Sequence, residues 1–244
     1  MARLTTARSM QRLAERVALV TGAAEGVGRA VALQLANEGA AVVLADSQED
    51  RLLIVANELR ELNHECLAFP ADVADEESVI GLVQQSLSHF KRIDILVNGA
   101  SLWCPAPVEG VTEEIWDKCI KTNLVSTFLC SKAVVPTMLA QRYGRIISFT
   151  SVDAIDGSKN AAHFAAAKAG IIGFSKALAL EVAPFGITAN TICIDEHSID
   201  VPAGTLGQCA RCTETMGSAV FLASDAASYV TGQMLGVSGA TESR

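Results

Sequence analysis

The chain has 244 residues, of which half are hydrophobic and 19% are charged, and its formal net charge is −8. This composition excludes a disordered chain, and the acidic balance leaves no electrostatic footprint for nucleic acid or anionic lipid. Because no stretch of 18 uncharged apolar residues occurs, we expect no membrane span.

Most of the seven cysteines lie in apolar stretches, which predicts buried thiols in a reducing, cytoplasmic compartment rather than a disulfide framework. Cys209 and Cys212 form a lone Cys-x-x-Cys, and without a second pair this spacing predicts no metal site. Residues 1–15 form a predicted basic arm. Its arginines are also typical of a mitochondrial targeting segment, so that alternative stays open.

Short apolar runs alternate with helical patterns along the whole chain. The predicted strands are residues 17–21, 41–45, 65–69, 93–97, 144–151, 188–192 and 233–237, and the predicted helices are residues 28–37, 49–62, 76–90, 112–141, 161–183 and 213–224. This order predicts one α/β domain over residues 16–244, a doubly wound, Rossmann-like parallel sheet with helices on both faces. The helix over 161–183 is small or apolar nearly all round, so we expect another subunit to cover part of it.

A glycine loop, Thr21-Gly-Ala-Ala-Glu-Gly-Val-Gly28, joins the first predicted strand to the first predicted helix. Gly22, Gly26 and Gly28, with Val27 beside them, let the backbone approach a pyrophosphate at the helix N-terminus. Asp46 ends the second strand, where a carboxylate accepts the ribose hydroxyls of NAD and repels the 2′-phosphate of NADP, and Glu25 adds a second negative charge. These residues predict NAD and not NADP. The simpler alternative is a tight turn with Asp46 capping a helix.

Further motifs in the same order make residues 16–239 resemble the short-chain dehydrogenase/reductase family. Asp72-Val73 is similar to the family's adenine contact, and Asn98-Gly-Ala100 to its Asn-Asn-Ala-Gly stretch. The family's catalytic set is Asn-Ser-Tyr-Lys, of which the resemblance assigns Asn123, Ser151 and Lys168. In the family the lysine also holds the nicotinamide ribose.

The fourth member of that set is absent, because Phe164 stands where the family has tyrosine. A benzyl group has no proton to exchange, and loss of a general acid–base costs about 10²–10⁴ in rate. His163 is adjacent but one helical step, about 100°, away, so we expect it on another face as a satisfied or surface histidine. Ser151 retains a hydroxyl, but we expect no base beside it to activate it.

The sequence departs from the family pattern in two further places, and both serve the same catalytic step as the missing tyrosine. The Pro-Gly that follows the sixth strand in the family is missing after Asn190, and only ten residues separate Asn190 from Val201, too few for the family's helical lid. The glycine loop favours NAD binding, whereas these changes disfavour its nicotinamide half. Retained NAD binding therefore stays open.

These features suggest a non-catalytic subunit of an NAD-dependent dehydrogenase, similar to the inactive chains of hetero-oligomeric members of the family. Some such pairs oxidise hydroxyacyl-CoA-type thioesters, including aromatic succinyl-CoA derivatives of anaerobic toluene breakdown. The resemblance implies an active paralogue as partner, held through residues 112–141 and 161–183 and the C-terminal helix and strand in a heterotetramer. Two alternatives remain: an active oxidoreductase with altered proton transfer, and an NAD-sensing regulatory subunit.

Overall fold

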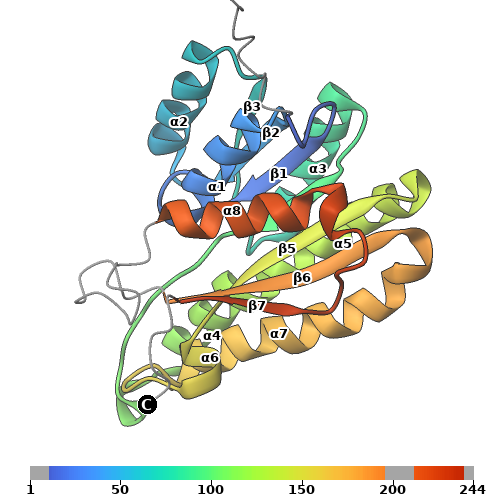
Figure 1. Ribbon diagram of the computed structural model, residues 1–244. Coiled ribbons are helices and arrows are strands. Elements are labelled where there is room, and N and C mark those ends of the chain that lie inside the picture. The colour runs from blue at the N-terminus through green and yellow to red at the C-terminus, as the bar shows by residue number, and fades with distance from the viewer. Residues whose placement is uncertain (1–10, 196–211, 239–244) are drawn as a thin grey trace, which may run out of the picture.

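A computed structural model describes residues 11–195 and 212–238 (Figure 1). Seven strands form one parallel sheet in the order β3-β2-β1-β4-β5-β6-β7. The strands are β1 (Val17–Thr21), β2 (Ala41–Asp46), β3 (Cys66–Pro70), β4 (Ile95–Asn98), β5 (Gly144–Ser151), β6 (Ile187–Ile194) and β7 (Met234–Val237). The doubly wound, Rossmann-like prediction is confirmed. The fourth strand begins at Ile95 rather than residue 93, although the Asp94 N–H already donates to the Val17 carbonyl of β1 at 2.9 Å.

Helices cover both faces of the sheet. They are α1 (Gly26–Asn37), α2 (Glu49–Glu61), α3 (Glu76–Phe90), α4 (Glu113–Ile120), α5 (Ser126–Gln141), the short α6 (Asp153–Asp156), α7 (Ala162–Val182) and α8 (Cys212–Ala223). The core residues divide into one cluster under α1, α2 and α8 and another under α3, α5 and α7. Burial on both faces explains why the strands read as continuous apolar runs rather than as alternating patterns.

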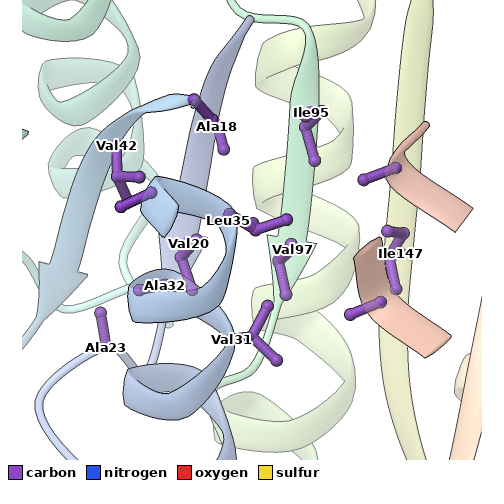
Figure 2. Close-up of a cluster of buried hydrophobic side chains, with 14 of the residues drawn as sticks. Ala18, Val20, Ala23, Val31, Ala32, Leu35, Val42, Ile95, Val97 and Ile147 are labelled. Atoms are coloured by element: carbon purple, nitrogen blue, oxygen red, sulfur yellow. The ribbon is translucent and has the colours of Figure 1, made fainter. Parts of the chain in front are cut away.

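Figure 2 shows the first of these clusters, where Val31, Ala32 and Leu35 of α1 meet the side chains of β1 and β4. All three are fully buried. Burying a Val or Leu side chain contributes about 1.5–3 kcal/mol, so this helix is fixed firmly against the sheet. Its N-terminus is therefore held in place beside the end of β1.

The packed chain begins before residue 16. Leu13 is 1% exposed and belongs to the core cluster under α1, and Arg12 forms an ion pair with Glu38 at the end of α1. The first ten residues of the predicted basic arm lie outside the described residues.

The predicted helix over 112–141 forms with an internal irregularity. Thr112 caps α4 as expected, its hydroxyl accepting from the Ile115 N–H at 3.3 Å. Between α4 and α5, Lys121–Val125 form a π-helical turn, and the side chains of Ser126 and Thr127 donate to carbonyls one turn back. Residues 113–141 are long and apolar enough to cross a membrane by length and composition, but α5 packs on β4 and β5 as a core helix does.

Candidate nucleotide cleft and reaction centre

The glycine loop lies between β1 and α1, at the carboxyl edge of the sheet. Gly22 has φ +66°, and a Cβ there would come within 2.6 Å of the Gly99 carbonyl oxygen, while a Cβ on Gly28 would lie 2.1 Å from the Gly22 carbonyl oxygen. Gly26 has φ +57°, and a Cβ placed on it would meet no atom within 4 Å. Glu25, the N-cap of α1, makes no capping bond through its side chain. The first N–H groups of α1 therefore remain for an anion, as a bound diphosphate requires.

Asp46 forms the wall of a cleft of about 570 Å³ that runs along this edge. Its carboxylate accepts hydrogen bonds from the backbone N–H groups of Ala24 at 3.1 Å and Gln48 at 2.9 Å. These two bonds fix the charged group at the cleft. The second negative charge expected from Glu25 is compensated, because Arg51 forms an ion pair with it. Of these two carboxylates, Asp46 is therefore the one on which any discrimination against a 2′-phosphate would depend.

The predicted cofactor residues fall into two groups. Those that line the cleft are Gly22, Gly26, Val27, Asp46, Asp72 and Val73. Gly28, Asn98 and Lys168 are not among its lining residues: Gly28 serves the close packing of the loop, and the Asn98 amide is buried, donating to Ser148 Oγ at 3.0 Å. The cleft thus fits the adenosine and diphosphate portions of a dinucleotide. Sequence reasoning missed its other wall, where Leu102, Thr122 and Ile194 also line it.

The four positions of the family's catalytic set lie on neighbouring elements. Ser151 ends β5, Asn123 lies in the π turn, and Phe164 and Lys168 are one turn apart in α7. Phe164 is completely buried, with its ring edge-to-face against Trp103 at a centroid distance of 4.8 Å. The Lys168 ammonium lies 5.2 Å from the Phe164 ring centroid. The tyrosine position is therefore filled by an aromatic ring packed as a core residue.

Asn123 connects the π turn to the loop that follows β4. Its amide donates to the carbonyls of Cys119 at 2.9 Å and Leu102 at 3.1 Å, and its oxygen accepts from the Leu102 N–H at 3.0 Å. A π turn projects one residue out of the regular helical pattern. That extra residue allows Asn123 to reach the loop while remaining fully buried.

Ser151 has a base beside it, contrary to the expectation from the sequence. Its hydroxyl donates to Asp153 Oδ2 at 3.0 Å, and the Asp153 N–H returns a bond to the Ser151 oxygen at 3.2 Å. Asp153 is 5% exposed, so the pair is held away from bulk water. The Ser-x-Asp spacing in the sequence was the signal for this contact, because the turn after β5 folds the carboxylate back onto the hydroxyl.

His163 also differs from its expected surface or satisfied state. It is 1% exposed; its Nε2 lies 2.6 Å from the carbonyl oxygen of Cys104, and its Nδ1 is buried without a hydrogen-bond partner among the described residues. The adjacent Cys119 is fully buried, and burial raises the pKa of its thiol to about 12. Cys209 lies outside the described residues, as does the side chain of Cys212.

Known proteins place this architecture in a family. The model of the short chain dehydrogenases matches residues 16–198. This chain belongs to the short-chain dehydrogenase family. It is 38% identical over 242 residues to the 3-oxoacyl-[acyl-carrier-protein] reductase of Synechocystis sp., covering 94% of this chain and 98% of the relative.

It is also 35% identical over 242 residues to the (2S)-[(R)-hydroxy(phenyl)methyl]succinyl-CoA dehydrogenase subunit BbsD of Thauera aromatica, covering 92% of this chain and 95% of that relative. A solved structure from Sinorhizobium meliloti 1021, assigned as a short-chain alcohol dehydrogenase, superposes with a TM-score of 0.89 at 28% identity, covering 94% of this chain and 97% of that one. The family, an oxidoreductase family that uses nicotinamide dinucleotides, is thereby established for this chain.

Proposed function

We propose that this chain is a non-catalytic subunit that assembles with an active family member into an NAD-dependent, hydroxyacyl-CoA-type alcohol dehydrogenase. The observation that carries this proposal is Phe164, a buried ring in the position of the proton-exchanging tyrosine. The hydrogen bond that would stabilise a developing alkoxide is lost together with the proton donor. The acyl-CoA class is supported by the similarity to a subunit of a [hydroxy(phenyl)methyl]succinyl-CoA dehydrogenase.

The outward face of α7 supports a partner. Most of its exposed positions are small or apolar, namely Ala162, Ala166, Ala169, Gly173, Ala177 and Leu180, and the charged Lys176 and Glu181 are exposed near its C-terminal end. Leu180 is 82% exposed, and Phe128 on the neighbouring α5 is 43% exposed. A flat apolar face of this kind allows a second helix pair to approach closely, and an exposed patch of this kind is typical of a protein–protein interface. We place the active paralogue on this face, in a cytoplasmic heterotetramer.

The cleft supports NAD rather than NADP as the nucleotide that this subunit retains. When bound, the dinucleotide would accept a hydride at its nicotinamide. This chain's own contributions are the anion site at the N-terminus of α1, the open backbone at Gly26, and the fixed carboxylate of Asp46 for the ribose. These residues hold and orient the adenosine and diphosphate portions without taking part in proton transfer.

The first experiment is to isolate the untagged protein from its source, measure the native mass and identify the chains that co-purify. We expect a stoichiometric complex with a family member that retains Tyr-x-x-x-Lys. Gly173→Arg should prevent that complex, because it places a large charged side chain on the proposed interface. The variant should still fold, since a Cβ at this position meets no atom within 4 Å and arginine is a good helix former. The matched control is Ile54→Arg on α2, away from the proposed interface. A homo-oligomer alone would overturn the proposal.

A second candidate function is favoured by the Ser151–Asp153 pair. In an active enzyme, the alcohol proton would pass to Ser151 Oγ while the serine proton moves to the Asp153 carboxylate. The isolated chain would then oxidise alcohols with NAD, and Asp153→Asn would abolish turnover while leaving NAD affinity unchanged. If the isolated chain shows no turnover and forms an active complex when the paralogue is added, the result favours the subunit proposal.

A further inference from the structure

Three potential metal ligands gather beside Phe164, and none of them lines the nucleotide cleft. Cys104 lies in the loop after β4, Cys119 in α4 and His163 in the first turn of α7, and one donor atom of each lies within 4.8 Å of the others. Cys119 and His163 are fully buried and Cys104 is half-buried. This cluster of three does not include Cys209 or Cys212. The spacing of residues 104, 119 and 163 matches no metal-binding motif, so the sequence alone did not predict the cluster.

Hydrogen bonds to the neighbouring backbone hold the segments that carry these three residues in place. Asn123 fixes Cys119 through its carbonyl and fixes the loop through Leu102. The Ala106 N–H donates to the Asn160 carbonyl at 2.8 Å, which ties the loop after Cys104 to the start of α7. The cluster is therefore preorganised by hydrogen bonds to the backbone of its segments, as a binding site requires.

The two ring nitrogens of His163 have different surroundings. His163 Nε2 lies 2.6 Å from the Cys104 carbonyl oxygen and 3.6 Å from Cys104 Sγ, and Nδ1 is buried without a hydrogen-bond partner among the described residues. Nε2 is therefore the ring nitrogen already beside one of the two sulfurs, and it is the nitrogen that would bind the ion.

Charge and distance both suit zinc. Two thiolates balance the charge of one divalent ion, so the buried complex has no net formal charge. Ligands at the usual Zn–S and Zn–N lengths, in a tetrahedron, stand about 3.5–3.8 Å apart. The cluster, already within 4.8 Å, closes around an ion with shifts of about 1 Å.

We propose that Cys104, Cys119 and His163 form a binding site for Zn²⁺. The ion replaces the two thiol protons, which leave to solvent, and bonds to one imidazole nitrogen without any redox change. The three protein ligands leave one tetrahedral position for an exchangeable fourth ligand. The site is independent of the proposed subunit role and lies on the Phe164 side of the molecule, where it would brace the loop after β4 against α7.

The test is a titration of the chelator-treated full chain with Co²⁺ and then Zn²⁺. We expect one Co²⁺ per chain, with thiolate-to-cobalt charge-transfer absorption and the strong visible bands of a tetrahedral site, and we expect Zn²⁺ to displace it. Cys104→Ser, Cys119→Ser and His163→Phe should each weaken binding by at least about 100-fold. Cys66→Ser, at a half-buried thiol outside the cluster, is the matched control.

Two further variants keep the test decisive. His163→Cys preserves three ligands, so it should retain Co²⁺ with an all-sulfur spectrum even if His163→Phe fails to fold. A Cys209→Ser/Cys212→Ser double variant should bind Co²⁺ as the wild type does. The proposal is overturned if the wild type gives no tetrahedral cobalt spectrum, or if that spectrum survives Cys104→Ser or disappears only in the 209/212 variant.

Discussion

The glycine loop and the surroundings of Phe164 lie along the same carboxyl edge of the sheet, but they are built from different parts of the chain. The loop is formed by backbone: Gly22 packs on Gly99, and Gly28 packs on Gly22. The reaction centre is formed by side chains on otherwise regular elements. A single substitution at the reaction centre can therefore remove a proton donor without disturbing the fold. The nucleotide cleft cannot be lost so simply, because the glycines that shape it also hold β1 against α1.

The largest effect should follow a change in the loop. Gly28→Ala places a Cβ 2.1 Å from the Gly22 carbonyl oxygen, which is backbone and cannot turn away. We expect the free energy of unfolding to fall by about 3 kcal/mol or more, measured by urea denaturation. Gly173→Ala, at a helical position with open space, is the control and should not destabilise. Equal stability of the two variants would contradict the contrast between loop and centre.

Asp46→Asn should affect nucleotide binding rather than folding. The amide keeps an oxygen that can accept one of the two backbone N–H bonds, but the charge that favours ribose hydroxyls over a 2′-phosphate is lost. We expect NAD affinity to fall about tenfold, which is about 1.4 kcal/mol, and the preference over NADP to shrink. Calorimetric titration with both nucleotides measures this. Asp50→Asn, an exposed charge on α2, should change neither value.

Phe164→Tyr sharpens the comparison at the reaction centre. We expect turnover by the isolated variant to stay below about 1 s⁻¹, because the Pro-Gly after β6 and the full-length lid segment are still missing from the sequence. The new hydroxyl enters a fully buried site, so stability should fall by about 1 kcal/mol if it gains no partner. Steady-state assays and thermal melting check both values, and efficient alcohol oxidation would refute this account.

The smallest effect concerns Glu38, far from both regions. The hydrogen bond from Arg12 lowers the pKa of its carboxyl. A lowered pKa stabilises the fold above the unfolded-state value, and this stabilisation disappears as the pH falls through the folded-state value. For a pair this exposed we expect Glu38→Gln to cost less than about 1 kcal/mol near neutral pH. Urea unfolding in acid should show variant and wild type converging.

The sequence predicted the sheet and the cleft well, because both depend on local patterns. The apolar runs gave all the strands and the glycine spacing gave the β1–α1 turn. It missed contacts made by chain reversal or by long-range packing. The bond between Ser151 and Asp153 depends on the turn after β5, and the approach of Cys104 to His163 depends on a loop meeting a distant helix. The segment between Asn190 and Val201, which we predict to be too short for a helical lid, lies outside the described residues beyond residue 195.

The π turn at Lys121–Val125 has a consequence for the long helix as a whole. Each helical residue advances the side chains by about 100°, so a single additional residue shifts the angular phase of everything that follows. Trp116 and Phe128, both exposed and on opposite sides of the turn, owe their relative orientation to it. A one-residue deletion in residues 121–125 would leave composition and length almost unchanged and would still rotate one half of the helix by about a quarter of a turn. Helical phase, and not residue identity alone, thus determines which surface the two halves present together.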